Sequence, residues 1–207
     1  MARESLGLSG CTGLVEATGR VAALIAQGGD VRLRIDSDAL GLDDVLLGDS
    51  IAVNGVCLTV VTFDAQGFEA DVSTETLSRT TLGSWTVGRR INLEKSLRFG
   101  DRVGGHLVSG HVDGVGRVVS IEADVRATRW RFAVPRTLSR FIAEKGSVAV
   151  DGVSLTVNAV ADEHFEVALI PHTQTVTAFS DTGVGSGVNL EVDLLARYLD
   201  RLNSGPR

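Results

Sequence analysis

Short runs of apolar and β-branched residues recur along this chain, and turn-forming residues separate them. In the first half they occupy residues 31–36, 50–54, 57–63, 68–72 and 91–96. Runs of this length and composition predict β-strands. The second half contains five similar runs, which read TRWRFAV, SVAVD, SLTVNAV, FEVALI and VNLEVD. The pattern predicts an all-β protein.

The two halves also repeat each other. Residues 54–60 read NGVCLTV and residues 151–157 read DGVSLTV, 97 positions further along. With the same shift and no gap, further matches align: Gly19–Val21 with Gly116–Val118, Phe68–Glu69 with Phe165–Glu166, and Asn92–Glu94 with Asn189–Glu191. Self-similarity at one fixed shift indicates a tandem duplication.

The repeated dipeptides Asn54-Gly55 and Asp151-Gly152 predict type I′ hairpin turns, because both central residues of that turn need a positive φ. Roughly six short strands in each copy predict a small closed antiparallel barrel, which leaves no exposed sheet edge. The expected fold is therefore two tandem six-stranded barrels related by internal duplication.

Two segments read as helices. PRTLSRFIAEKG (residues 135–146) begins with proline and ends with glycine, which is typical of a helix. After the second copy, VDLLARYLDRLN predicts a C-terminal helix whose apolar residues share one face: Leu194, Leu195, Tyr198, Leu199 and Leu202. This face fits either docking on its own barrel or packing against copies of itself in an oligomer.

The expected organisation follows from these elements. It comprises an N-terminal leader (1–9), a first barrel (10–98), a linker near 98–106, a second barrel (106–193) and a C-terminal helix and tail (194–207).

Composition excludes several classes of protein. The net charge is −6 and no run of Lys or Arg occurs, which argues against nucleic-acid and anionic membrane partners. The first ten residues lack the apolar core of a secretory signal, and no apolar run is long enough to span a bilayer. The two cysteines show no metal-binding spacing and fit a reducing compartment. The sequence predicts a cytoplasmic protein without a metal site.

Positions where the two copies differ in polar chemistry are candidates for divergent roles. The pairs are Leu14 and His111, Gly48 and Lys145, Cys57 and Ser154, Glu75 and His172, and Ser96 and Asp193. Each difference alone fits drift at the surface. Together they describe two similar pockets with different titratable groups, which would suit a reaction that treats two similar ligands differently.

Six strings then resemble one family. CTGLVE, GDSIAVNGVCLTV, ADVSTETLSRTTLG, GGHLVSGHVDGVG, KGSVAVDGVSLTVN and LIPHT are similar to the alpha-type riboflavin synthases in order and spacing, over residues 11 to about 198. The resemblance implies two Greek-key barrels and a C-terminal helix that joins three protomers. It also implies transfer of a four-carbon unit between two molecules of 6,7-dimethyl-8-ribityllumazine, which yields riboflavin and 5-amino-6-ribitylaminopyrimidinedione. Neither cofactor nor metal takes part, and an association with lumazine synthase is left open.

The same resemblance implies the site residues, with the active site between the first barrel of one protomer and the second barrel of its neighbour. The expected catalytic residues are Ser50, Cys57, His111, Lys145 and Asp193. Backbone and small polar groups at strand edges are expected to bind the flat ring and the ribityl chain. The binding set from the first copy is Gly13, Leu14, Val15, Cys57, Leu58, Thr59, Asp71, Val72, Ser73, Thr74, Glu75 and Thr76. The set from the second copy is Gly110, His111, Val112, Lys145, Ser154, Leu155, Thr156, Ile170, Pro171, His172, Thr173, Gln174 and Thr175.

Three points stay open in the sequence. The family usually begins Met-Phe-Thr-Gly, whereas this chain has Cys11-Thr12-Gly13, and Cys11 could form a redox-sensitive pair with Cys57. His106 is interpreted as a structural histidine. The alternative function is that of a lumazine or flavin-binding antenna protein, which shares the fold and catalyses nothing.

Overall fold

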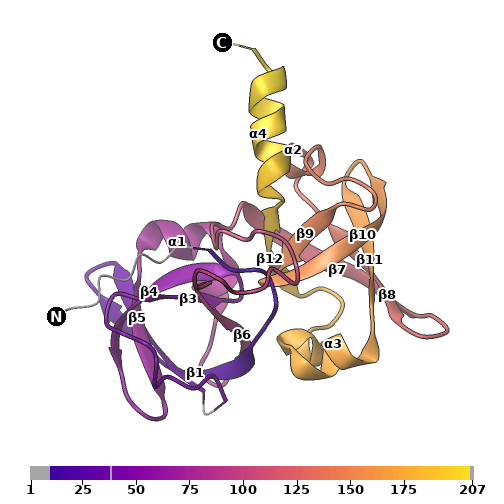
Figure 1. Ribbon diagram of the computed structural model, residues 1–207. Coiled ribbons are helices and arrows are strands. Elements are labelled where there is room, and N and C mark those ends of the chain that lie inside the picture. The colour runs from indigo at the N-terminus through magenta and orange to yellow at the C-terminus, as the bar shows by residue number, and fades with distance from the viewer. Residues whose placement is uncertain (1–9, 38, 206–207) are drawn as a thin grey trace.

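The computed structural model describes residues 10–37 and 39–205 and consists mainly of two β-barrels, one for each copy of the repeat (Figure 1). The predicted leader, residues 1–9, lies outside the described residues. The fold class predicted from the sequence is confirmed: two closed six-stranded antiparallel barrels are followed by a C-terminal helix.

The first barrel contains strands β1 (Ala17–Gln27), β2 (Asp30–Asp36), β3 (Ser50–Val53), β4 (Val56–Phe63), β5 (Gly67–Val72) and β6 (Arg90–Lys95). They close in the order β1-β2-β5-β4-β3-β6. The pairing of β2 with β5 and of β1 with β6 skips sequence neighbours, as in a Greek key. Strand β1 is the one strand of this barrel that the sequence analysis did not delimit.

The second barrel repeats this topology. Its strands are β7 (Gly114–Ala123), β8 (Thr128–Ala133), β9 (Ser147–Val150), β10 (Val153–Ala161), β11 (His164–Leu169) and β12 (Gly187–Val192). They close in the order β10-β11-β8-β7-β12-β9, which is the same circle as in the first barrel. The duplication in sequence is therefore a duplication of structure.

Each barrel is filled by the inward-facing residues of its strands. Strand β4 alternates buried Val56, Leu58 and Val60 with the more accessible Cys57 and Thr59. Because successive side chains of a strand point to opposite faces, the apolar set fills the core and the polar set lies outside. The core of the second barrel is richer in aromatic rings, and its ring contacts join Trp130, Phe132, Phe165 and Phe179.

The barrels pack against each other around the two predicted hairpin turns. Asn54 and Asp151 have φ values of 44° and 47°, and each is followed by a glycine with a φ of 77°. A Cβ atom on Gly55 would lie 2.7 Å from the backbone nitrogen of Gly152, so only glycine allows this contact between the turns. The Asn-Gly and Asp-Gly repeats thus form both the hairpins and the centre of the barrel interface.

Two buried asparagines extend this interface. The Asn92 side chain donates to the carbonyl of Asp151 (2.9 Å) and accepts from the amide of Ala178 (2.7 Å). Asn189 makes the equivalent bonds to Asn54 (3.0 Å) and Thr81 (2.8 Å). Since buried polar groups are costly unless they are paired, these reciprocal bonds fix one relative orientation of the barrels.

Short helices follow β5 and β11, where none was predicted. They are α1 (Thr74–Arg79) and α3 (Pro171–Val176), each followed by a 3-10 helix, η1 (Thr81–Ser84) or η2 (Ala178–Asp181). The helix predicted over residues 135–146 is wrong in length, because α2 covers only Arg136–Ser139. Beyond it the amides of Phe141 and Ile142 bond to carbonyls only three residues earlier (3.0 and 3.1 Å), so the chain continues in turns and not as an α-helix.

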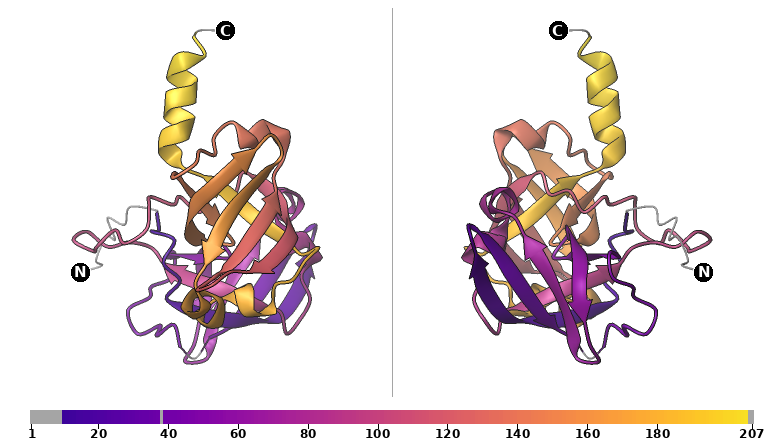
Figure 2. Two further views of the ribbon diagram at one scale, coloured as in Figure 1. Left: turned by 90° about the vertical axis from the view of Figure 1, so that its right-hand side faces the viewer. Right: turned by 90° about the vertical axis from the view of Figure 1, so that its left-hand side faces the viewer.

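The C-terminal helix α4 (Leu194–Asn203) projects away from both barrels (Figure 2). Ion pairs of Arg197 with Asp113 and of Arg140 with Asp200 connect it to the second barrel. Its apolar face stays uncovered, with Leu195, Tyr198, Leu199 and Leu202 between 60% and 79% exposed. Within the described residues, no helix has the length and apolarity needed to cross a membrane.

Candidate active site

The start of strand β4 contacts a segment from the other copy of the repeat. The amide of Cys57 donates to the carbonyl of Gly110 (2.9 Å), and Gly110 has a φ of +77°. A Cβ atom on Gly110 would lie 2.5 Å from the Cβ of Cys57. Val112 packs against the first core. Residues 110–112 of the second copy therefore form a wall beside Cys57 of the first barrel.

The reciprocal contact is made at the start of β10. The amide of Ser154 donates to the carbonyl of Gly13 (2.8 Å), and a Cβ atom on Gly13 would lie 2.6 Å from the Cβ of Ser154. Val15 packs against the second core, while Leu14 is exposed. The structure thus regroups the predicted binding segments: residues 13–15 lie at the second barrel and residues 110–112 at the first. Barrel packing exchanges the two segments, which the order of the sequence does not reveal.

The predicted polar residues of the strands point outward. Ser50 lies opposite Thr59 and Ala52 opposite Cys57 in the pairing of β3 with β4, so Ser50, Cys57 and Thr59 share the outer face of the first barrel. Ser154 and Thr156 occupy the equivalent face of the second barrel. Leu58 and Leu155 point into the cores, and their side chains are unavailable to a ligand. Only their backbone could contribute to the predicted binding set.

The third pair of predicted segments lies at the same end of each barrel. Ala70 of β5 is opposite Val60 of β4, so in this antiparallel pair the end of β5 lies beside the start of β4. Val167 and Val157 make the same arrangement in the second barrel. Of residues 71–76 and 170–175, only Asp71 and Val72 lie in a strand, because α1 begins at Thr74 and α3 at Pro171. Val72 is buried in the core.

Several side chains of these segments already have structural partners. Asp71 forms a two-bond ion pair with Arg32, and Glu75 pairs with Arg79 one helical turn later. Ser73 accepts from the amide of Thr76 as the N-cap of α1, and Thr74 bonds to Gly29 and Asp30. In the second copy Gln174 bonds to Leu169 and Thr175 to Pro171, whereas His172 is exposed and Ile170 is 54% exposed. Thr173 accepts a bond from Thr177 through its carbonyl.

A histidine that the sequence analysis left out of the site lies in direct contact with Ser154. The Nδ1 of His106 is 2.7 Å from the hydroxyl oxygen of Ser154. The amide of His106 donates to the carbonyl of Thr12 (3.0 Å). A Cβ atom on the preceding Gly105 would lie 2.1 Å from that carbonyl, so glycine permits the close approach. The available signal was the first histidine in GGHLVSGH, in a chain with only four.

The surroundings of His106 favour a neutral imidazole. Burial lowers the pKa of His106, and the negative charges of Asp193 and Glu191 oppose this shift. Its Nε2 atom is buried and has no hydrogen-bond partner among residues 10–37 and 39–205. A neutral imidazole can accept the hydroxyl proton of Ser154 or receive a proton from a nearby ligand. Asp193 also caps helix α4, accepting from the amide of Leu195 (2.9 Å).

Lys145 holds a backbone conformation that a side chain disfavours. Its φ is +65°, and its amide donates to the carbonyl of Val157 (2.8 Å). The equivalent residue of the first barrel is Gly48, with a φ of +90° and the same bond to Val60. A left-handed residue other than glycine costs about 1–2 kcal/mol and is concentrated at functional sites. The exposed lysine in this place therefore supports a role for its side chain.

Cys11 is a buried neighbour of this region. It packs with Ala52, Val108 and Ala149, and its backbone pairs with Val108. Burial, reinforced by the charge of Glu94, raises the pKa of the Cys11 thiol, so the thiol stays protonated. Both Cys11 and Cys57 are free thiols. The hypothesis of a redox-sensitive pair stays a prediction.

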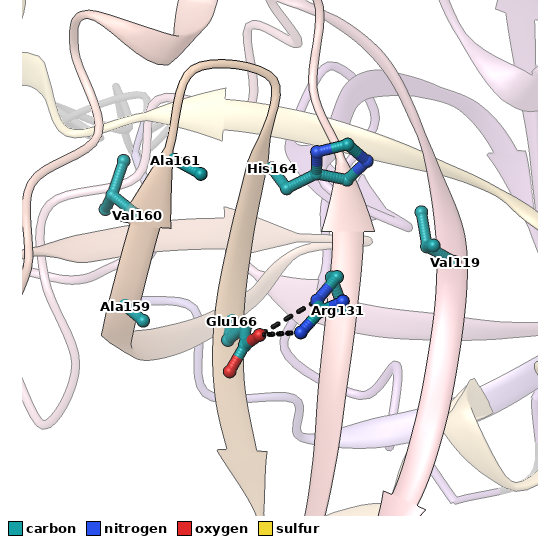
Figure 3. Close-up of a pocket in the computed structure, with 7 residues that line it drawn as sticks. All are labelled: Val119, Arg131, Ala159, Val160, Ala161, His164 and Glu166. Atoms are coloured by element: carbon teal, nitrogen blue, oxygen red, sulfur yellow. Dashed lines mark hydrogen bonds and ion pairs between the residues drawn. The ribbon is translucent and has the colours of Figure 1, made fainter.

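A separate hollow of about 230 Å³ lies on the outer surface of the second barrel (Figure 3). It is lined by Val119, Arg131, Ala159, Val160, Ala161, His164 and Glu166, with an Arg131–Glu166 ion pair at one side. The first copy has Thr62, Phe63 and Asp64 where the hollow has Ala159, Val160 and Ala161. The hollow includes no predicted site residue, and the contacts that both barrels repeat around Cys57 and Ser154 make that region the stronger candidate for the active site.

Comparison with known proteins defines the class first. A family model described as the lumazine-binding domain matches the chain twice, over residues 12–96 and 109–193. The structure resembles LumP bound to riboflavin, with a TM-score of 0.80, 24% identity and coverage of 87% of this chain and 97% of that chain. LumP bound to 6,7-dimethyl-8-(1'-D-ribityl) lumazine gives a TM-score of 0.78 at 23% identity. The similarity to LumP shows a shared fold, and the chain consists of two tandem domains of the lumazine-binding domain family.

The curated relatives narrow this class. Riboflavin synthase of Photobacterium phosphoreum is 48% identical over 191 residues, which cover 92% of this chain and 88% of the relative. Riboflavin synthases of Mycobacterium bovis and Bacillus subtilis are 46% and 41% identical, each over 92% of this chain, and covered to 96% and 88% of their own lengths. The chain belongs to the riboflavin synthase family, and the resemblance predicted from its motifs is confirmed.

Proposed function

We propose that this protein dismutates two molecules of 6,7-dimethyl-8-ribityllumazine to riboflavin and 5-amino-6-ribitylaminopyrimidinedione, the last step of riboflavin biosynthesis. The observation that carries this proposal is that the two barrels place different reactive groups in equivalent positions, each against a left-handed glycine of the other copy. One presents Cys57 beside Gly110, and the other presents Ser154 beside Gly13 and His106. Two like molecules bound in unlike surroundings can serve as donor and acceptor.

The reaction needs few chemical groups. The ring delocalises the carbanion formed when the 7-methyl group of one lumazine loses a proton, and a nucleophile adds at C7 of the other. The neutral His106, bonded to Ser154, is suited to accept a proton, and Cys57 or water can supply a nucleophile. Ser50, Thr156, His111, Asp193 and Lys145 complete the proposed catalytic and binding groups, with Lys145 reaching across the interface. Holding the two rings together contributes up to about 7–11 kcal/mol to lowering the barrier.

The proposed enzyme is a homotrimer in which each site combines the first barrel of one chain with the second barrel of a neighbour. The uncovered apolar face of α4, at Leu195, Tyr198, Leu199 and Leu202, supports association through this helix. Removal of residues 194–207 should yield monomers, and turnover should fall more than about 100-fold because each site loses its second half. Sedimentation and riboflavin formation measure both effects, and full turnover in a monomer contradicts the shared site.

The primary test is direct. Purified protein is incubated with 6,7-dimethyl-8-ribityllumazine, and the absorbance of riboflavin is followed without added cofactor or metal. We expect steady formation of riboflavin, and we expect His111→Ala and Cys57→Ser to reduce turnover about 10- to 100-fold with an unchanged circular dichroism spectrum. Binding of the lumazine without its conversion to riboflavin would contradict the proposed enzymatic activity.

That outcome would favour the alternative of an antenna protein. The similarity to LumP supports this alternative only through the fold, because the identity is 23–24%. The retention of Lys145, Ser154, Thr156 and Asp193 in the second barrel supports the enzyme.

Location and partners complete the proposal. We infer a cytoplasmic enzyme, because its substrate and product belong to cofactor biosynthesis and its two cysteines are free thiols. An association with lumazine synthase would place the two enzymes in one complex. Co-sedimentation of the purified proteins tests it, and separate sedimentation of the two contradicts it.

A further inference from the structure

A buried glutamate on the last strand of each barrel binds the segment that forms a pocket wall. In β12, Glu191 is 5% exposed and accepts three hydrogen bonds from the wall of the Cys57 pocket. Its Oε1 accepts from the amide (2.6 Å) and hydroxyl (2.7 Å) of Ser109, and its Oε2 accepts from the amide of Gly110 (3.0 Å). Both carboxylate oxygens are used.

Glu94 of β6 repeats the arrangement at the other pocket. It is 6% exposed, and its Oε1 accepts from the amide (2.6 Å) and hydroxyl (2.9 Å) of Thr12. Its Oε2 accepts from the amide of Gly13 (3.0 Å). Burial raises the pKa of Glu94, while the bonds from Thr12 and Gly13 oppose that shift.

The hydroxyl groups extend each cluster by one more bond. The Ser109 hydroxyl, which donates to Glu191, also accepts from the amide of His111 (3.3 Å). The Thr12 hydroxyl accepts from the amide of Leu14 in the same way (3.3 Å). Glu191 therefore fixes residues 109–111, and Glu94 fixes residues 12–14. The last residues of the two segments, His111 and Leu14, are one of the pairs at which the two copies differ.

The segments held in this way lie against the opposite barrel. Gly110, held by Glu191 of the second barrel, contacts Cys57 of the first barrel. Gly13, held by Glu94 of the first barrel, contacts Ser154 of the second. A carboxylate suits this task because it accepts on both oxygens, whereas an amide would direct an NH₂ group at one of the backbone donors.

We propose that Glu94 and Glu191 are positioning residues that set the geometry of one lumazine pocket each, with Glu191 acting on the Cys57 pocket and Glu94 on the Ser154 pocket. The inference rests on the proposed function for its effect on turnover. Its structural part is that each glutamate holds a segment that contacts the opposite barrel, and this part rests on hydrogen bonds within the chain.

The test compares the full-length variants Glu191→Gln and Glu94→Gln with Glu122→Gln, a matched control at an exposed glutamate of β7. Iodoacetamide labelling followed by mass spectrometry measures the reactivity of Cys57, because Cys11 is buried and its thiol stays protonated. Riboflavin serves as the probe ligand, and its protection of Cys57 reports occupancy of that pocket. Calorimetric titration with riboflavin counts the sites, and sedimentation verifies the oligomeric state.

We expect Glu191→Gln to accelerate Cys57 labelling about fivefold or more and to abolish riboflavin protection, because the Gly110 wall opens locally. Glu94→Gln should leave labelling and protection within about twofold of the wild type while it weakens the other riboflavin site. Both should lower kcat about 10- to 100-fold, with less change in KM, since misplacement of a reacting group reduces the chemical step. Glu122→Gln should change none of these quantities.

Equal effects of the two variants on both pockets, or a kcat equal to that of Glu122→Gln in both, would overturn the proposal. If Glu191→Gln does not fold, Ser109→Ala replaces it, because it removes only the hydroxyl between Glu191 and His111. That variant should still accelerate Cys57 labelling, and unchanged labelling would count against the proposal. A wild-type protein that binds riboflavin at two sites without forming it from lumazine would defeat the proposed function, while the labelling experiment would still decide the positioning role.

Discussion

Cys57 of the first barrel and Ser154 of the second occupy equivalent places at the start of a strand, each with its amide bonded to a left-handed glycine from the other copy. The two barrels make equivalent hydrogen bonds around these residues, both at the hairpin turns and at the buried glutamates. The surroundings differ in a few side chains: Ser154 has His106 at hydrogen-bond distance, and Lys145 replaces Gly48. The shared bonds maintain the same fold in both copies, and the proposed difference between donor and acceptor depends on the few positions at which the copies differ.

The largest expected effect tests the difference in proton transfer. His106→Asn keeps a hydrogen-bonding group near Ser154 but removes the titratable ring, so kcat should fall about 100-fold. Because burial lowers the pKa of His106, protonation should inhibit the wild type only below about pH 6.5, and the variant should lose this acidic limb. The pH profile of riboflavin formation measures both. His111→Asn should retain the acidic limb, and its disappearance there would contradict the assignment.

The next effect tests what the barrels share. Gly110→Ala would combine a positive φ with a Cβ atom 2.5 Å from the Cβ of Cys57, and Gly13→Ala would do the same beside Ser154. Each should reduce the free energy of unfolding by about 3 kcal/mol or more. Gly48→Ala is the control, because its φ is +90° but nothing lies within 4 Å; it should cost about 1 kcal/mol. Urea unfolding of the three variants measures the loss in free energy of unfolding. Equal losses in all three would show that close packing is not the cause.

A smaller effect concerns the asymmetric pair Asn54 and Asp151 at the barrel interface. Burial raises the pKa of Asp151 from 3.8 to about 7, so the folded state binds a proton that the unfolded state releases. The stability from this group is present below about pH 4 and is lost as the pH rises toward 7. Asp151→Asn should remove that loss and raise the free energy of unfolding by roughly 2–4 kcal/mol at pH 8, but not at pH 4.

The oxygen of an asparagine should fit at this position, because the Asn54 Oδ1 already accepts from the amide of Asn92 as the Asp151 Oδ1 accepts from that of Asn189. The buried Nδ2 of Asn54 has no hydrogen-bond partner among the described residues, so the same group at position 151 should lower the stability of the variant equally at both pH values. Urea titrations of the variant and the wild type at the two pH values measure the difference. If the variant gained the same free energy of unfolding at pH 4 and at pH 8, protonation of Asp151 would not be the cause of the difference in stability.

The smallest effect tests the strained lysine. Lys145→Gly restores the residue type of the first barrel and should raise stability by about 0.5–1 kcal/mol, because glycine adopts a positive φ without a clash. Turnover should fall at the same time if the ammonium group acts in the site. Thermal unfolding and riboflavin formation measure the two. Lower stability with unchanged turnover would mean that the lysine is retained for packing.

Much of this protein is determined by its sequence alone. The fixed shift of 97 residues, the β-branched runs and the Asn-Gly and Asp-Gly turns are local signals, and they specify two barrels of the same topology. The six motif strings identify the family, which the relatives confirm. The sequence analysis did not predict the short helices α1 and α3, because they closely follow strands and have no long apolar face. The predicted length of α2 was wrong because the chain continues in turns closed by three-residue bonds, such as that from Ile142 to Ser139, although its apolar residues keep a helical spacing.

Only the tertiary structure decided which segments meet. Residues 13–15 lie at the second barrel and residues 110–112 at the first, because packing around Gly55 and Gly152 crosses the two segments over. The contact of His106 with Ser154 and the bonds of Glu94 and Glu191 to the pocket walls depend on the same crossing. A sequence pattern records the periodicity of each strand, but contacts between distant segments arise from how complete barrels pack, which no local pattern encodes.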